Sequence, residues 1–232
     1  TYSYVQDPAT CLDNEATITL KIGPYAGVPS PNISICDDNE SLNLFQAFDG
    51  TQLAPQQNGY WIGNDTSLTL SGNKINPKLL GEGNYSYTYT VPALDICPEQ
   101  TATISVSIFR KPIAGIATDL VLCSSANLAS YSNLNLNDLL SGEDAGGSWA
   151  DDTGTGQISS SADNKIDVAA IYNTFGAGTY IFIYTVFSSN PICTNSQSKV
   201  KIVIEDPLDF TGSTLTINSD ICENEIPTAT YS

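Results

Sequence analysis

The stretch from Gly81 to Val91 reads GEGNYSYTYTV, and a second stretch from Gly176 to Val186 reads GAGTYIFIYTV. Aromatic side chains at every second position predict a β-strand with one aromatic face, because successive side chains of a strand point to opposite faces. We expect a buried core face rather than a sugar-stacking surface. The residues on this face are Tyr85, Tyr87, Tyr89, Tyr180, Phe182 and Tyr184.

The two stretches belong to a longer repeat with an offset of roughly 90 residues, which suits a whole small domain better than a solenoid unit. Each copy also contains a Cys, a Leu-x-Leu, a Gly-x-Trp, an Asn-Lys-Ile and a final Ile-Cys. The landmarks are Cys36, Leu42, Leu44, Trp61 and Cys97 in one copy, and Cys123, Leu134, Leu136, Trp149 and Cys193 in the other.

Fragments of the same repeat lie at both ends of the chain, where Cys11 matches the end of a copy and Cys222 the beginning of one. We therefore expect the chain to begin and end within an array. Residues 1–23 are predicted to be the C-terminal hairpin of a preceding repeat, and residues 207–232 the N-terminal part of a following one. The ranges 24–112 and 113–206 are predicted to be one domain each.

Each repeat is predicted to contain five to seven strands. Two long alternating runs flank a turn with Pro and Cys, which predicts one hairpin per repeat, and a short strand ends at the first Cys. A second strand is expected to carry the Leu-x-Leu. Helical periodicity is weak, although residues 134–140 allow one short turn. This pattern favours an all-β fold of tandem immunoglobulin-like antiparallel sandwiches in an extended rod, with Trp61 and Trp149 as core residues between the sheets.

Composition argues against several functions. The 25 acidic residues against eight Lys and Arg give a formal charge of −17, which disfavours nucleic acid and anionic membranes as partners. There is no His, the commonest general base near neutral pH, so we expect no enzyme and no cofactor. The longest apolar runs are far shorter than the roughly 20 residues that span a bilayer, so no membrane span is expected.

Acidic turns offer oxygen atoms that suit Ca²⁺, but they lack the spacing of an EF-hand loop. Solvated turns are the simpler interpretation, and no residue is assigned to a metal; calcium stays an open alternative. These turns are at residues 37–40, 143–144 and 151–152.

The six cysteines recur at matching positions, which indicates an oxidising, extracytoplasmic setting. Strands of seven or eight residues would hold the two cysteines of one repeat roughly 25 Å apart, while a disulfide needs Cα atoms within about 7 Å. This favours an inter-domain bond between Cys36 and Cys193. Two other arrangements stay open: bonds within repeats (Cys36 with Cys97, Cys123 with Cys193) and sequential bonds (Cys11 with Cys36, Cys97 with Cys123, Cys193 with Cys222). The first two leave Cys11 and Cys222 to partners elsewhere.

The cysteine positions, the Gly-x-Trp and the Gly-x-Tyr-x-Tyr-x-Tyr resemble the immunoglobulin-like or PKD-like repeats of very large Bacteroidota cell-surface adhesins. Such proteins include gliding-motility adhesins and other substrates of the type IX secretion system. The resemblance covers nearly the whole chain, and its motifs are structural. It implies an extracellular protein at the surface of a bacterium that adheres to external surfaces or polysaccharide.

We therefore expect a structural stalk segment of a repetitive adhesin, with neighbouring repeats of the same chain as its partners. Surface attachment and gliding motility are the implied roles. Two alternatives stay open: a carbohydrate-binding accessory region of a large secreted enzyme, and a filament or surface-layer subunit. The carbohydrate-binding alternative requires exposed aromatic residues on one face, and the filament alternative requires self-assembly.

Overall fold

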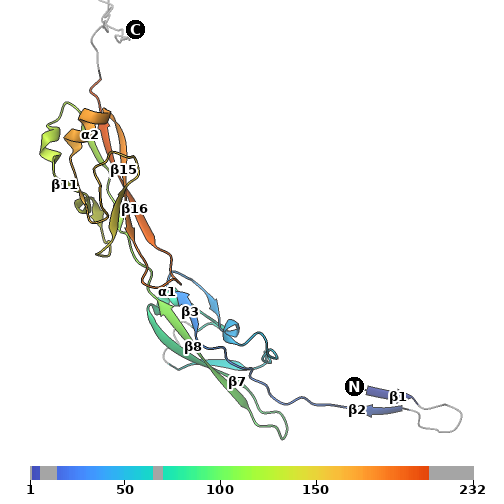
Figure 1. Ribbon diagram of the computed structural model, residues 1–232. Helices are drawn as coiled ribbons and strands as arrows, with labels where there is room; N and C mark the ends of the chain where they lie inside the picture. The colour runs from blue at the N-terminus through green and yellow to red at the C-terminus, as the bar shows by residue number, and fades with distance from the viewer. Residues whose placement is uncertain (1, 6–14, 65–69, 209–232) are drawn as a thin grey trace, which may run out of the picture. The chain divides into compact units, whose positions relative to one another are not determined.

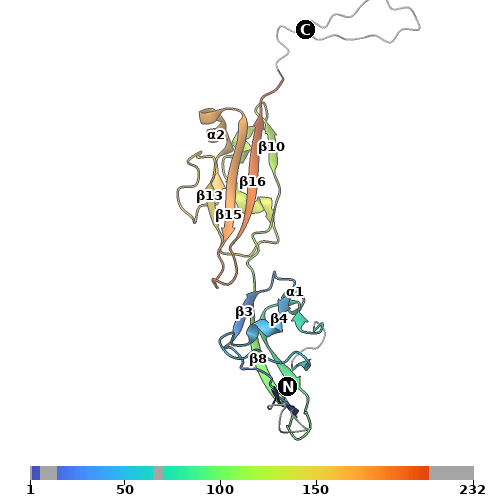
Figure 2. The same cartoon turned by 90° about the vertical axis from the view of Figure 1, so that its right-hand side faces the viewer.

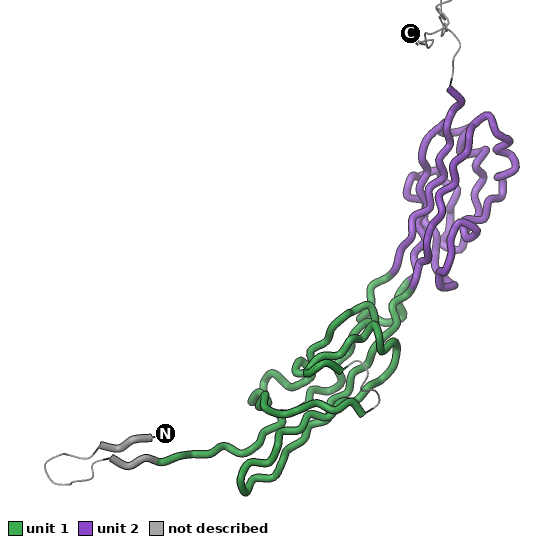
Figure 3. The backbone as a smooth tube through the Cα atoms, turned by 180° about the vertical axis from the view of Figure 1, so that it is seen from behind, with its two compact units in different colours: residues 1–112, 187–195 green, residues 113–186, 196–232 purple. Residues whose placement is uncertain are grey.

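The computed structural model describes residues 2–5, 15–64 and 70–208 of the 232-residue chain. Contacts divide the chain into two compact units, coloured separately in Figure 3. Unit 1 comprises residues 1–112 together with 187–195, and unit 2 comprises residues 113–186 and 196–232. Both are immunoglobulin-like β-sandwiches, so the predicted all-β fold class is confirmed.

The main sheet of unit 1 has four strands in the order β3-β8-β7-β5 (Figure 1). Strands β7 (Gly83–Val91) and β8 (Gln100–Phe109) form a long antiparallel hairpin. At its edges, β5 (Tyr60–Gly63) pairs antiparallel with β7, and β3 (Ile33–Cys36) pairs parallel with β8. The hairpin predicted for the aromatic stretch is therefore the centre of the sheet.

Short elements form the opposite layer of unit 1. Strand β4 (Leu42–Asn43) pairs antiparallel with β6 (Lys74–Ile75), so the Leu-x-Leu and Asn-Lys-Ile motifs lie side by side. The 3₁₀ helix η1 (Leu44–Ala47) and helix α1 (Pro77–Leu80) follow these two strands. Near the N-terminus, β1 (Tyr2–Val5) and β2 (Glu15–Ile18) form a separate antiparallel pair.

Unit 2 repeats this arrangement, with a four-stranded sheet in the order β10-β16-β15-β13 that Figure 2 shows side by side. Strands β15 (Gly178–Val186) and β16 (Ser196–Glu205) form the antiparallel hairpin. Strand β10 (Leu120–Cys123) pairs parallel with β16, and β13 (Ser148–Asp151) pairs antiparallel with β15. The strand order and directions are those of unit 1.

The opposite layer of unit 2 again consists of short pairs. They are β11 (Leu134–Asn135) with β14 (Lys165–Ile166), and β9 (Ile116–Ala117) with β12 (Leu140–Ser141). In sequence, the 3₁₀ helix η2 (Leu128–Tyr131) precedes β11, the 3₁₀ helix η3 (Leu136–Leu139) follows it, and helix α2 (Val168–Phe175) follows β14.

A hydrophobic core fills the space between the two layers of each unit. Buried side chains alternate along the hairpin strands, as expected for strands with one face toward the core. The largest fully buried side chains are Leu44, Ile75, Tyr87, Tyr89, Ile104 and Ile108 in unit 1, and Leu136, Ile166, Ile171, Phe182, Ile202 and Ile204 in unit 2.

Three local features differ from what the sequence predicted. The strand expected to carry Leu42 and Leu44 ends at Asn43. It ends there because the Asn43 side chain accepts a hydrogen bond from the Phe45 N–H (3.0 Å) and so starts a 3₁₀ turn. Helix α2 was not predicted, although Asp167 is its N-cap and Gly176 follows its end. Strand β2 ends at Ile18, although the alternating run of residues 16–22 predicted a strand that continues to residue 22.

Candidate functional site at the Cys36–Cys193 disulfide

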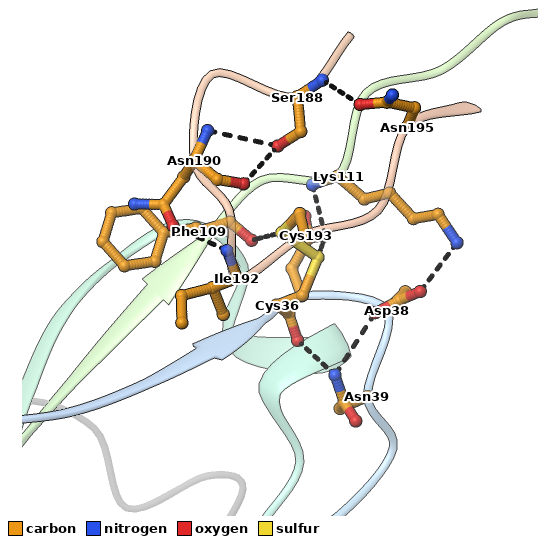
Figure 4. Close-up of a disulfide and its surroundings, with 11 residues drawn as sticks. Cys36, Asp38, Asn39, Phe109, Lys111, Ser188, Asn190, Ile192, Cys193 and Asn195 are labelled. Carbon is orange, nitrogen blue, oxygen red and sulfur yellow. Dashed lines mark hydrogen bonds and ion pairs between the residues drawn. A yellow bond between two sulfur atoms is a disulfide. The ribbon is translucent and has the colours of Figure 1, made fainter. Parts of the chain in front are cut away.

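Cys36 and Cys193 form a disulfide with Cα atoms 5.1 Å apart, although 157 positions separate them in the sequence (Figure 4). Both cysteines are buried. Cys193 lies in the segment 187–195, which connects β15 to β16 of unit 2 but has its contacts in unit 1. Because residues 187–195 belong to unit 1 by their contacts, the disulfide lies within unit 1. Its two cysteines nevertheless come from different repeats of the sequence.

The strand that ends at Cys36 places this cysteine beside the last residue of β8, since the parallel register aligns it with Phe109. The turn after Cys36 is fixed by hydrogen bonds. The Asp37 N–H donates to the carbonyl oxygen of Phe109 (2.9 Å), and the Asn39 side chain donates to the carbonyl oxygen of Cys36 (3.0 Å). Cys36 is therefore held at the end of the sheet, with its backbone direction set.

The residues that follow β8 contact the same turn. The carboxylate of Asp37 accepts a hydrogen bond from the Lys111 N–H (2.8 Å), and the Lys111 ammonium forms an ion pair with Asp38 (2.7 Å). The ion pair is partly exposed and contributes little by itself. The backbone contact is the more important one, because it fixes the chain where it leaves unit 1.

The segment that carries Cys193 is ordered by its own polar side chains (Figure 4). The Ser188 hydroxyl donates to the carbonyl oxygen of Asn190 (2.7 Å), and the same carbonyl accepts the Cys193 N–H (3.1 Å). The Asn190 side chain accepts the Ile192 N–H (2.9 Å), and the Asn195 side chain accepts the Ser188 N–H (2.9 Å). The loop thus presents Cys193 in one backbone conformation.

Of the three cysteine arrangements considered, the structure contains the one that joins Cys36 to Cys193. Bonds within a repeat and sequential bonds are wrong, since Cys97 and Cys123 are free thiols among the described residues. The physical reason is the length of the last strand. Each repeat holds its two cysteines at opposite ends of a ten-residue strand, roughly 30 Å apart. Cys11 and Cys222 lie outside the described residues.

The predicted core aromatics have structural partners. The Tyr89 and Tyr184 hydroxyls accept hydrogen bonds from the N–H of Gly59 and Gly147 (2.9 Å each). A Cβ at Gly147 would lie 2.4 Å from the Tyr184 ring, so no larger residue fits there. The glycine of each Gly-x-Trp is therefore required by the tyrosine two strands away in sequence. Tyr87, Tyr89, Tyr180, Phe182 and Tyr184 are buried, and Tyr85 is partly buried.

The two tryptophans differ in their surroundings. Trp149 is 4% exposed, and its indole N–H donates to Asn137 Oδ1 (2.7 Å). Trp61 is partly buried, stacks near Tyr89 with ring centroids 4.9 Å apart, and has no hydrogen-bond partner for its buried N–H among the described residues. Asn137 was not predicted, although it follows the Leu-x-Leu of its repeat directly.

The acidic turns are local structural elements. The Asp151 carboxylate accepts hydrogen bonds from the N–H groups of Thr153, Gly154 and Gly156 and from the hydroxyl of Thr155. Within residues 2–5, 15–64 and 70–208, no three His, Cys, Asp or Glu side chains gather in a metal-binding group. No helix in the same ranges is long and apolar enough to cross a membrane.

No family model matches the chain, and no curated protein matches it. Similar solved structures include an I-band fragment of titin, at 10% identity over 80% of this chain and 66% of that one (TM-score 0.38). Human mucin-like protocadherin EC1-2 matches at 8% identity over 79% and 99% (TM-score 0.33). The immunoglobulin domains 1–5 of Sidekick-1 match at 10% identity over 85% of this chain and 41% of theirs (TM-score 0.31).

Proposed function

We propose that this chain is a structural stalk segment of a large repetitive extracellular protein that attaches a bacterium to surfaces or polysaccharide. The single observation that carries the proposal is the disulfide between Cys36 and Cys193. It adds a second covalent connection between two consecutive repeats that the backbone already connects at residues 110–113. A second connection restricts bending between the repeats, and this is what a stalk needs in order to keep its reach.

The repeated residues support a mechanical role because each of them has a structural task. The tyrosines hold the glycines before the tryptophans, and the Leu-x-Leu pairs with the Asn-Lys-Ile in both units. These tyrosines, glycines, leucines and isoleucines are therefore occupied by contacts within their own unit. The proposal therefore includes no catalytic step and no resident cofactor or metal.

Two further properties support an extracellular position. A disulfide persists in oxidising compartments, and this one is buried at both cysteines. The formal charge of −17 keeps neighbouring molecules apart through repulsion. Export by the type IX system of a Bacteroidota cell and a part in gliding motility complete the proposal, and both come from the resemblance of the repeats to adhesins.

The carbohydrate-binding alternative has less support. The aromatics that were considered for stacking on sugars include Tyr87, Tyr89 and Trp149, and these are at most 4% exposed. A sugar ring stacks only on an accessible aromatic face. The exposed aromatics Tyr60, Phe175 and Phe187 are not part of the shared motifs.

Small-angle X-ray scattering of the whole chain tests the stalk proposal. We expect the oxidised chain to give a narrow distribution of dimensions, and the reduced chain or the double variant Cys36→Ser/Cys193→Ser to give a broader one. Identical distributions would show that the bond does not restrict bending and would contradict the proposal. Saturable binding of the same sample to a glycan array would favour the carbohydrate-binding alternative, and ordered fibres would favour a filament subunit.

A further inference from the structure

The two free thiols of the described chain, Cys97 and Cys123, occupy the same positions in the repeat as the two bonded cysteines. Cys123 corresponds to Cys36, because each ends the strand that pairs parallel with the last strand of its unit. Cys97 corresponds to Cys193, because each lies in the loop of the long hairpin. Cys36 and Cys123 are therefore strand-type cysteines, and Cys97 and Cys193 are loop-type cysteines.

The backbone around Cys123 has the same hydrogen bonds as the backbone around Cys36. Cys123 is in register with Glu205, the last residue of β16, as Cys36 is with the last residue of β8. The Ser124 N–H donates to the Glu205 carbonyl oxygen (2.7 Å), matching the bond from Asp37 to Phe109 (2.9 Å). A strand-type cysteine is thus presented in the same way in both repeats, bonded in one and exposed in the other.

The loops show a matching difference. An isoleucine precedes the cysteine in both, and Ile192 beside the bonded Cys193 is 46% exposed, whereas Ile96 beside the free Cys97 is 98% exposed. A partner that covered Ile96 would remove apolar surface from water, which is favourable. The loop around Cys97 is itself ordered, since Leu94 and Cys97 exchange two backbone hydrogen bonds (3.0 and 2.9 Å).

Cys97 and Cys123 are both free thiols in the structure and are not bonded to each other. Cys97 lies beside the beginning of β8 and Cys123 beside the end of β16, and each is held by the fold of its own unit. The bond in this chain joins a strand-type cysteine of one repeat to a loop-type cysteine of the next. The same pairing gives each free thiol a partner of opposite type in another repeat.

We propose that Cys123 accepts a loop-type cysteine, and Cys97 a strand-type cysteine, from further repeats of the same kind, with strand-type bonding to loop-type only. This inference rests on the proposed function and adds a direction to the stalk, since its two ends are chemically complementary. Two protein thiols lose their hydrogens to one low-molecular-weight disulfide, such as oxidised glutathione. The products are one protein disulfide and two low-molecular-weight thiols, so atoms and electrons balance.

A mixture of two full-length variants tests the pairing rule, with second copies of this chain as the probe. One variant keeps Cys123 as its free thiol (Cys11→Ser, Cys97→Ser, Cys222→Ser), and the other keeps Cys97 (Cys11→Ser, Cys123→Ser, Cys222→Ser). Both retain the bond between Cys36 and Cys193. Equal amounts are brought to equilibrium in a glutathione redox buffer, and the three disulfide-linked dimers are counted by non-reducing mass spectrometry.

Thiols without preference give as much mixed dimer as both symmetric dimers together. We expect the ratio of mixed dimer to the sum of the symmetric dimers to be about 10-fold or more above this random value, which is equivalent to ~1.4 kcal/mol. Adding Ile96→Asp should return the ratio to the random value without unfolding, because that side chain is solvent-exposed. The matched control Leu79→Asp, also at an exposed apolar residue (72%), should leave the excess unchanged.

A random ratio for the unmodified pair would overturn the pairing rule. Peptide mapping of the same samples separates this failure from a failure of the proposed function. If the map contains the bond between Cys36 and Cys193 while the dimers are random, the stalk proposal stands and the rule fails. If the map lacks that bond, both fail.

Discussion

Replacing Cys36 and Cys193 together by serine is expected to destabilise both units, because the bond limits the unfolded conformations of either one. The register of β3 and β8 places Cys36 beside Phe109, which precedes Cys193 by 84 positions. If unit 2 unfolds while unit 1 stays folded, the bond therefore closes a loop of that length rather than of 157. In the chain-entropy model, such a loop raises the free energy of the unfolded state by about 4–5 kcal/mol.

The same estimate applies to unit 1. In unit 2, the Ala114 N–H donates to the hydroxyl of Ser196, three positions after Cys193 (3.1 Å). If unit 1 unfolds while unit 2 stays folded, the loop runs from Cys36 to about residue 114 and has nearly the same length. The expected loss is therefore again about 4–5 kcal/mol, so the bond should protect both repeats nearly equally.

Tryptophan fluorescence can separate the two units, because each contains one Trp. In the Trp61→Phe background the signal reports on unit 2, and in the Trp149→Phe background it reports on unit 1. Urea titrations of each background, with and without the two serine substitutions, give the change in the free energy of unfolding. The reduced parent protein is the matched control, because Cys36 and Cys193 are buried and a serine hydroxyl there adds its own cost.

A loss below about 1 kcal/mol in both units would refute the loop-closure reasoning. A loss confined to unit 1 would refute it differently. It would mean that segment 187–195 stabilises only the unit it contacts, and that the bond places no constraint on the unfolded chain of unit 2.

Three further predictions concern unit 2. Gly147→Ala brings a Cβ to 2.4 Å from the Tyr184 ring and should cost about 1–3 kcal/mol in the free energy of unfolding, whereas Gly50→Ala, with open space around it, should cost far less. Asn137→Ala leaves a buried indole N–H unpaired and should cost about 1–3 kcal/mol by the same measurement; an unchanged stability would contradict this role. Hydrogen bonds from two hydroxyls lower the pKa of Asp206 below its ordinary value of 3.8, so its stabilising contribution is complete above pH 3.8 and is lost as the pH falls through the folded value; a carboxyl NMR titration with a midpoint at or above 3.8 would contradict it.

The sequence predicted the centre of each unit well, because period-two aromatics leave little choice of secondary structure. The strands around Tyr87 and Phe182 are within two residues of their predicted ends. Strand length, combined with the expected immunoglobulin-like strand order, also favoured the bond between Cys36 and Cys193 over bonds within a repeat. Both predictions depend on a period or a length, and these are properties that a sequence carries directly.

Features that depend on single polar side chains were not predicted. Helix α2 has apolar residues at Val168, Ile171 and Phe175. With only eight residues, the helix is too short for its helical periodicity to be recognised among the surrounding strands. The Asn43 side chain ends a strand by accepting a hydrogen bond from the N–H of Phe45, two residues later, and Asn137 accepts one from an indole 12 positions away. Such contacts depend on backbone conformations that the residue types alone do not specify.

The bond between Cys36 and Cys193 also determines which residues carry load when the chain is pulled from its ends. Tension passes along β3 to Cys36, crosses the sulfur atoms to Cys193 and continues along β16, so the 157-position interval between them lies outside the path. That interval cannot extend until the disulfide is reduced, and its release would then add roughly 50 nm of contour length. The disulfide therefore keeps the pulling force away from the cores around Tyr89 and Tyr184. This additional length becomes available only after a reductant breaks the disulfide.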